Sequence, residues 1–162
     1  MRACSLLDVN LYLRSELLSI FGSLFPVIIC GVAVAWDLRK REIPDTLSLI
    51  LLVGSLVALA FGDWTQWWSH ALGGVVGLLA AALVSRGDRF GGGDVKLFAS
   101  LCTWFGIFSV VPLGLWIAIA GLPLSVVAAL RKQEDLAYAP AIFIGVCVHV
   151  MCPDLFLRIA GL

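Results

Sequence analysis

The chain has 162 residues, of which 61% are hydrophobic and only 14% are charged. Soluble domains have roughly 45–50% apolar and about 25% charged residues, so this composition, with a mean hydropathy of +1.03, indicates a membrane protein. We expect one membrane-embedded domain over residues 1–162. The formal net charge of zero excludes the strongly basic surface of a nucleic-acid-binding protein.

The first part of the chain predicts a spanning helix that ends at an acidic residue. Residues 1–16 mix charged residues with leucines and lack the pattern of a cleaved signal peptide, so we expect an interfacial helix or a tail. Residues 17–36 are apolar. Twenty helical residues cover about 30 Å, the thickness of the hydrocarbon core. This span is expected to end at Asp37, directly before the basic residues 39–41.

Two more apolar helices are predicted over residues 46–61 and 67–84. Asp45 follows a proline and can cap the first of them. Gly73 and Gly77 lie four residues apart in the second. A G-x-x-x-G pair in a membrane helix indicates close packing against a neighbouring helix.

The second half of the chain predicts three further helices. A short one covers residues 94–105, a long one covers residues 107–130, and the last covers residues 137–152. Gly121 and Pro123 can kink the long helix, because neighbouring helices satisfy freed backbone groups. The fold class is therefore all-α, a polytopic membrane protein with about six transmembrane helices.

Basic residues gather in alternate loops of this predicted topology. Since cytoplasmic loops carry an excess of Lys and Arg, the loops after the first, third and fifth spans are predicted in the cytoplasm, with both termini outside. This orientation puts Asp37 and Asp94 at the same cytoplasmic edge of the membrane. The basic residues of these loops are Arg39, Lys40, Arg41, Arg86, Arg89, Arg131 and Lys132.

Two carboxylates at one membrane edge indicate acid–base chemistry. When Asp37 and Asp94 lie close together, their like charge raises the pKa of one member, so that the pair shares a proton. The ionised member can then activate a water, and the protonated member can donate to a scissile carbonyl. This arrangement predicts an aspartic peptidase that needs neither a metal nor a cofactor.

The segment around Asp94 has further candidate residues. Gly91, Gly92 and Gly93 lack side chains and tolerate dihedrals that other residues avoid, which lets an extended substrate backbone approach the acid. Lys96 either attracts the membrane-surface part of a substrate or extends to the lipid headgroups. A flexible loop with a helix cap is the simpler interpretation of the same segment.

The sequence indicates a functional role less strongly for the other polar residues. Asp45 lies in the same loop as Asp37 and is its rival, although a capping role explains it. His70 and His149 have no partner at metal-ligand spacing, and the former is expected at the interface and the latter packed in a helix. The five cysteines form no C-x-x-C pair and are expected to pack as small apolar residues.

Two motifs resemble those of the type IV prepilin peptidase family. They are Asp37-Leu38-Arg39-Lys40-Arg41-Glu42-Ile43-Pro44-Asp45 and Gly91-Gly92-Gly93-Asp94-Val95-Lys96-Leu97, and Tyr138-Ala139-Pro140-Ala141-Ile142 is similar to a third segment. The resemblance implies a polytopic aspartic protease of the bacterial inner membrane. It would cleave the leader of a prepilin-type substrate at the cytoplasmic face, with Asp37 and Asp94 as the catalytic pair.

The resemblance also implies a compact form of this family. Conventional members carry a large cytoplasmic insert with paired cysteines and methylate the new N-terminus of the substrate. Here only a short loop separates the first two predicted spans. The chain is in this respect similar to the peptidases of tight-adherence (Flp-type) pilus systems, which implies cleavage without methylation.

Three alternatives remain open at this point. A small transporter or channel subunit could use the two acids for proton or cation passage, although a midplane acid would suit it better. A non-catalytic assembly factor would rely on the small residues Gly73 and Gly77 instead. A presenilin-like protease shares the G-x-G-D core, but Trp36 precedes Asp37 where that family has tyrosine. The sequence identifies neither the pilin nor the oligomeric state.

Overall fold

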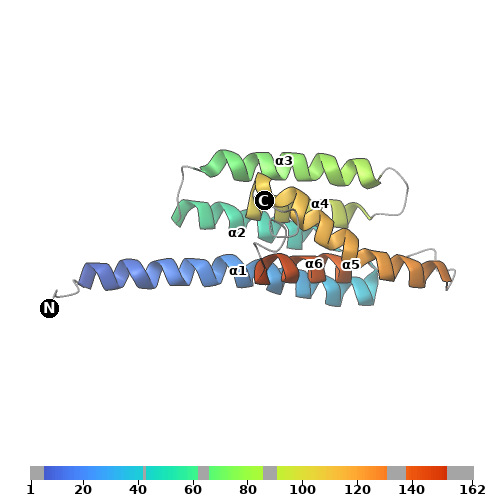
Figure 1. Cartoon of the computed structure of the whole chain (residues 1–162), viewed down its shortest axis with the longest axis horizontal. Coiled ribbons are helices and arrows are strands. Elements are labelled where there is room, and N and C mark those ends of the chain that lie inside the picture. The colour runs from blue at the N-terminus through green and yellow to red at the C-terminus, as the bar shows by residue number, and fades with distance from the viewer. Residues whose placement is uncertain (1–5, 42, 62–65, 86–90, 131–137, 153–162) are drawn as a thin grey trace.

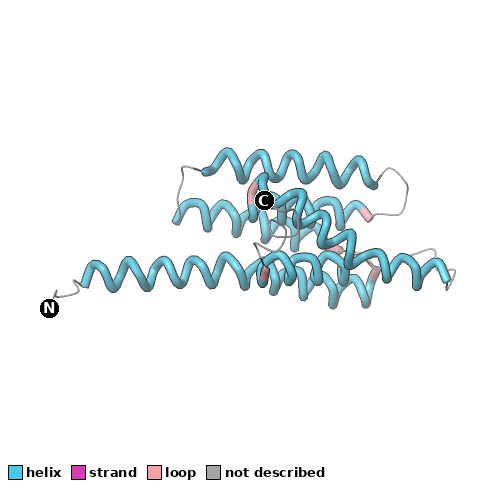
Figure 2. Tube along the Cα trace, viewed as in Figure 1, coloured by secondary structure: helices cyan, strands magenta, loops and turns pink. Residues whose placement is uncertain are grey.

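Every regular element of the computed structural model is a helix, within the described residues 6–41, 43–61, 66–85, 91–130 and 138–152. The predicted loops at residues 62–65, 86–90 and 131–137, residue 42 and both chain ends lie outside them. Figure 2 shows helix along all of the described elements, with short connections between them. The helices are α1 (Leu6–Lys40), α2 (Asp45–Phe61), α3 (Trp67–Val84), α4 (Gly92–Phe105), the 3-10 turn η3 (Ile107–Ser109), α5 (Val110–Leu130) and α6 (Ala139–Met151).

The helices lie mostly along one axis of the molecule (Figure 1). In this view α2 and α4 lie between α3 on one side and α1 with α6 on the other, and the N-terminal part of α1 projects beyond the other helices. The main packing partners are α3 with α4, α5 with α6, α2 with α4 and α1 with α6. The all-α prediction is confirmed, and most predicted helix boundaries agree closely with the structure.

The first helix differs from its prediction at both ends. It begins at Leu6 rather than at residue 17, so residues 6–16 are continuous with the expected span. It also continues past Asp37 to Lys40. Leu, Arg and Lys are strong helix formers, and basic residues favour the last turn of a helix. Asp37 consequently lies inside α1, one turn before its end.

Three described helices contain a segment long and apolar enough to cross a membrane. The segments are Ile20–Lys40, Trp67–Val84 and Ile107–Val127, and α2 and α6 are shorter apolar helices. The 14 residues of α4 correspond to about 21 Å of helix, which is less than the roughly 30 Å of the hydrocarbon core. The total of six spans therefore stays a prediction.

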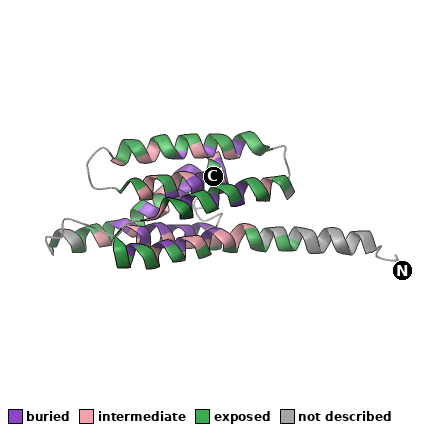
Figure 3. Ribbon diagram, turned by 180° about the vertical axis from the view of Figure 1, so that it is seen from behind, coloured by how far each residue is buried: buried purple, intermediate pink, exposed green. Residues whose placement is uncertain are grey.

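Apolar side chains face outward as well as inward, as expected in lipid. On α3, for example, Leu79 and Leu83 are 58% and 60% exposed. The buried positions gather on the inner faces of the helices (Figure 3), where Leu97 and Leu101 of α4 have no exposed surface. Because lipid is as apolar as leucine, packing of helix against helix holds these elements together.

Pro26 is compatible with the continuous helix α1 because another helix replaces its missing donor. A proline has no N–H, so the carbonyl four residues earlier, that of Gly22, loses its helical partner. The indole Nε1–H of Trp104 on α4 donates to this Gly22 oxygen at 2.9 Å. The Trp104 ring also stacks on Phe25, with ring centroids 5.0 Å apart. This contact fixes α4 against α1.

The G-x-x-x-G pair packs against α4, as the sequence predicted. A Cβ atom at Gly73 would touch the carbonyl oxygen of Cys102 and lie 2.8 Å from the carbonyl carbon of Gly106. A Cβ atom at Gly77 would lie 2.7 Å from the Cys102 sulfur. Gly106 itself has φ +84°, a conformation that favours glycine, and it ends α4 beside Ser69. The glycines therefore set how closely α3 approaches α4.

Gly73→Ala is expected to lower the stability of the purified protein on the order of 1–3 kcal/mol, because the new methyl group meets backbone atoms that cannot move aside. The matched control is Gly22→Ala, since a Cβ atom there meets nothing within 4 Å. Thermal unfolding in detergent provides the comparison. Equal melting temperatures of the two variants would contradict the close α3–α4 contact.

Candidate active site

Asp37 is a buried acid held at the start of another helix. Its side chain is only 6% exposed, and its Oδ2 accepts a hydrogen bond from the backbone N–H of Ala139 at 3.1 Å. Ala139 is the first residue of α6, where N–H groups have no intrahelical acceptor. Pro140 follows in the same turn and has no N–H to leave unsatisfied. This one bond joins residues that are 102 positions apart.

Asp94 lies in the first turn of α4, which begins at the glycine run. Gly91 is the N-cap residue, and its carbonyl accepts from the N–H of Asp94 at 3.0 Å. The Asp94 Oδ1 atom is buried and has no hydrogen-bond partner among the described residues. A buried acceptor without a partner typically costs about 1–3 kcal/mol. A catalytic role is one of the reasons for which a native protein keeps such an unsatisfied polar group.

Asp37 and Asp94 lie close enough to interact electrostatically. Asp94 is outside the three segments long enough to span the membrane. Burial raises the pKa of Asp94 to about 6, the negative charge of Asp37 adds to this rise, and a hydrogen bond from the Gly91 backbone opposes it. Near neutral pH, Asp94 therefore gains and loses a proton readily. This is the behaviour that acid–base chemistry requires.

Tyr138 is the third polar side chain of this region. It is the N-cap residue of α6, directly before the Ala139 amide that binds Asp37. Burial raises the pKa of Tyr138, and the charge of Asp94 raises it further, so the phenol stays protonated at neutral pH. Tyr138 and Asp94 also line the same cavity. The site thus has a hydroxyl beside the acid that carries the proton.

The three glycines before Asp94 have different surroundings. A Cβ atom at Gly93 would lie 2.8 Å from the Ile43 carbonyl oxygen, so this glycine lets α4 begin against the chain segment before α2. A Cβ atom at Gly92 would meet nothing within 4 Å, and one at Gly91 would meet only Asp94 Oδ2 at 3.6 Å. Gly91 has an ordinary φ of −64°. Open space, rather than unusual backbone geometry, distinguishes Gly91 and Gly92.

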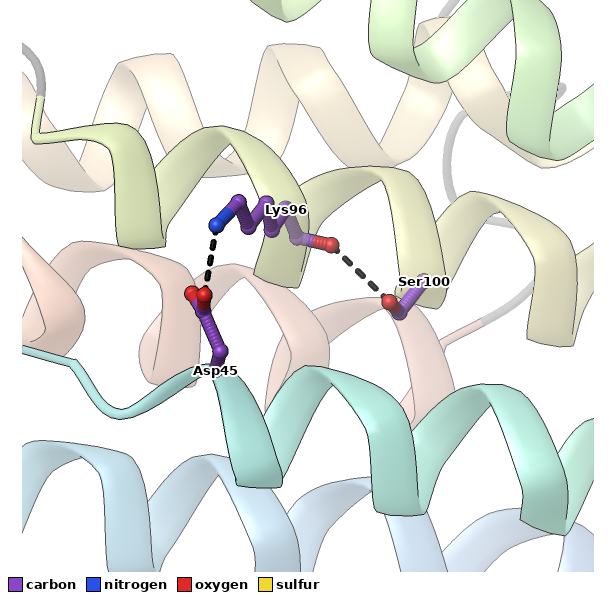
Figure 4. Close-up of polar contacts among 3 residues, drawn as sticks. All are labelled: Asp45, Lys96 and Ser100. Carbon is purple, nitrogen blue, oxygen red and sulfur yellow. Dashed lines mark hydrogen bonds and ion pairs between the residues drawn. The ribbon is translucent and has the colours of Figure 1, made fainter.

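Lys96 and Asp45 form an ion pair beside the site (Figure 4). The Lys96 Nζ atom lies 2.6 Å from Asp45 Oδ2, and the side chains are 54% and 68% exposed. The Lys96 carbonyl accepts a hydrogen bond from Ser100 one turn further along α4. An exposed pair of this kind typically contributes only about 0–1 kcal/mol. Its effect is to join the first turns of α2 and α4 and to neutralise the Asp45 carboxylate.

The structure thus separates the predicted site residues into groups. Asp37 and Asp94 are brought together, whereas Asp45, the rival of Asp37, is exposed and paired with Lys96. A role of Lys96 or the glycines in substrate binding stays a prediction. Tyr138 was not among the predicted site residues, although its Tyr-Ala-Pro segment was singled out. No sequence signal indicates that a backbone N–H would hold Asp37.

The family model described as type IV leader peptidase family matches residues 24–126. A protein of Dickeya chrysanthemi named prepilin leader peptidase/N-methyltransferase is 29% identical over 134 residues, which are 76% of this chain and 47% of that protein. A protein of the same name from Aeromonas salmonicida is 27% identical over 153 residues, 85% of this chain and 52% of that protein. The chain therefore spans about half the length of the curated relatives it matches. No solved structure gives a significant match.

Asp94→Asn is expected to raise the melting temperature at about pH 7.5 but not at about pH 3.5. The pKa of Asp94 is about 6 in the folded protein, against an ordinary value of 3.8. A raised folded pKa stabilises the fold fully below the ordinary pKa, and this stabilisation is lost as the pH rises through about 6. Above that pH the ionised carboxylate destabilises the fold, whereas asparagine does not.

The control for this comparison is Asp45→Asn, which removes an exposed carboxylate in a neighbouring helix turn. Thermal unfolding of all three proteins at both pH values gives the answer. A gain in Asp94→Asn that is the same at both pH values would contradict the raised pKa.

Proposed function

The chain belongs to the type IV leader peptidase family, and we propose that it is a membrane aspartic endopeptidase that removes the leader peptide of a prepilin-type substrate. Asp37 and Asp94 are the proposed catalytic pair. The observation that carries the proposal is their meeting in one site, where the charge of Asp37 contributes to raising the pKa of Asp94 to about 6. The names of the relatives support the substrate class.

The two acids take different roles in the proposed reaction. Asp94 carries the shared proton, because burial and the charge of Asp37 raise its pKa. Asp37, held by the Ala139 N–H, acts as the base. It takes a proton from a water as the water oxygen attacks the scissile carbonyl carbon, and Asp94 donates its proton to the carbonyl oxygen. Positioned acid–base groups typically contribute 10²–10⁴-fold to a rate.

The tetrahedral intermediate then collapses. Asp37 gives its proton to the amide nitrogen as the carbon–nitrogen bond breaks, and Asp94 recovers its proton from the hydroxyl that becomes the new carboxyl group. The pair returns to its starting protonation, so the cycle consumes one water and needs neither a covalent intermediate nor a metal. The open space at Gly91 and Gly92 provides room for a peptide main chain beside Asp94.

Cleavage is proposed to occur at the cytoplasmic face of the inner membrane and without N-methylation. The end of α1 carries Arg39 and Lys40 close to Asp37, and the Lys40 ammonium lies 5.0 Å from the centre of the Trp36 ring. Basic residues at a helix end favour the cytoplasmic side, and tryptophan favours a membrane–water interface. Only residues 41–44 separate α1 from α2, and this is the place where the family resemblance locates a methyltransferase insert.

The test is cleavage of a tagged, co-expressed prepilin, followed as a size shift on a gel. Asp37→Asn and Asp94→Asn are each expected to lower the cleavage rate at least about a hundredfold, because either change removes one proton-transfer group. Mass spectrometry of the product is expected to show an unmethylated N-terminus.

Asp45→Asn is the matched control, since it removes a nearby carboxylate outside the buried pair. It is expected to retain cleavage, with all variants present in the membrane at equal levels. Full cleavage by Asp37→Asn or Asp94→Asn would overturn the proposed pair. Absence of cleavage, together with a proton flux in vesicles that Asp94→Asn abolishes, would favour transport instead.

A further inference from the structure

An apolar groove leads away from the proposed catalytic pair. It has a volume of about 330 Å³ and lies between α3 and α5, with α4 behind it. Ala81 and Val84 of α3 face Val111 and Gly114 of α5 across it. Among the described residues that line the groove, only Asp94 and Tyr138 have polar groups in their side chains.

The groove is open toward the outside of the helix bundle. The rim residues Val84 and Val111 are each 67% exposed. Along this region α3 packs on α4 and α5 packs on α6, with little contact between α3 and α5 themselves. A ligand within the membrane can therefore reach the Asp94 side chain sideways, between two apolar helices.

The absence of a side chain at Gly114 makes the groove deeper, and close packing of helices does not require a glycine at this position. A Cβ atom at this position would meet only the end of the Phe98 ring at 3.6 Å, an ordinary contact. At Gly145, by contrast, a Cβ atom would lie 2.8 Å from the Ile117 backbone nitrogen. A glycine inside a helix costs about 1 kcal/mol relative to alanine. At Gly145 close helix packing explains that cost, whereas at Gly114 the result is empty space.

We propose that this groove binds the apolar segment that adjoins the scissile bond of the substrate, a proposal that rests on the proposed function. The polar lining decides between a peptide and a lipid as occupant. Asp94 Oδ1 is buried without a hydrogen-bond partner among the described residues. A peptide main chain and its attacking water supply donors and acceptors to this acid, whereas a lipid acyl chain supplies none.

The dimensions indicate how such a segment binds. Ligand pockets have volumes of roughly 300–1,000 Å³, and this groove lies at the lower limit. It accommodates apolar side chains from one face of the segment, while the opposite face remains in lipid. Because Asp94 lines the groove, a seated segment places an adjoining peptide bond beside the acid. The groove thus selects substrates that are cut next to an apolar stretch.

The first experiment fills the groove. Ala81→Leu adds three carbon atoms to its lining, whereas Ala82→Leu adds the same atoms to the next, exposed residue of α3, which does not line it. With a purified, tagged prepilin titrated in detergent as the probe, Ala81→Leu is expected to lower kcat/KM about tenfold or more, mainly through KM, since one or two methylenes in a pocket have effects of this size. Ala82→Leu is expected to match the wild type. Both variants should reach the membrane and melt at the temperature of the wild type.

The second experiment measures binding without cleavage. The photocrosslinking residue p-benzoylphenylalanine replaces Val111 at the rim of the groove in the Asp94→Asn variant. The control replaces Ile119 instead, which is also exposed on α5 but does not line the groove. The prepilin is expected to crosslink at position 111 and not at position 119. This result supports binding of the substrate in the groove even if neither the wild type nor any variant cleaves the prepilin.

Three results would contradict substrate binding in the groove while leaving the proposed function intact. They are normal cleavage by Ala81→Leu, crosslinks at position 111 to lipid only, and crosslinks there to a second copy of this chain only. Absence of any prepilin crosslink at position 111 would overturn it as well.

Discussion

The hydrogen bond from the Ala139 N–H to Asp37 is the contact on which the site depends. It joins the end of the first helix to the start of the last and holds a buried carboxylate in one place. An isolated charge away from water is costly unless it is paired or hydrogen-bonded. The Ala139 amide at the start of α6, which has no intrahelical acceptor, donates to this carboxylate and helps to meet that need. The negative charge of Asp37 in turn contributes to raising the pKa of Asp94.

The position of Asp94 depends in turn on how α4 is held. Gly73 and Gly77 let α3 approach α4 closely, and the Trp104 indole donates to the Gly22 carbonyl that Pro26 leaves free. These contacts join a short, central helix to its neighbours through backbone groups. Close backbone approach and hydrogen bonds are effective where lipid removes the usual hydrophobic driving force. The fold thus fixes the helix, while the first turn that carries Asp94 borders open space at Gly91 and Gly92.

Much of this arrangement is predictable from the sequence. Apolar runs separated by charged and glycine-rich segments predict the helices, and the basic residues in alternate loops predict that Asp37 and Asp94 lie at one edge of the membrane. The charged cluster after Trp36 predicts a helix end at Asp37, whereas α1 continues to Lys40, because Leu, Arg and Lys are helix formers. The Ala139 amide, the pair of Lys96 with Asp45 and the groove at Gly114 depend on contacts between distant segments. Periodicity within one segment has no information on such contacts.

Asp94 holds a proton to a higher pH than an ordinary aspartate, partly because of the negative charge of Asp37. Infrared difference spectroscopy of the purified protein, wild type minus Asp94→Asn, isolates the carbonyl stretch of a protonated Asp94 during a pH titration. We expect a band that is present at about pH 5 and disappears around pH 6, in line with the pKa of about 6. In an Asp37→Asn background the band should disappear at a lower pH, because one cause of the raised pKa is gone. Absence of the band at pH 5 would show that the pKa of Asp94 is not raised. A band that disappears at the same pH in the Asp37→Asn background would show that the charge of Asp37 does not contribute to the rise.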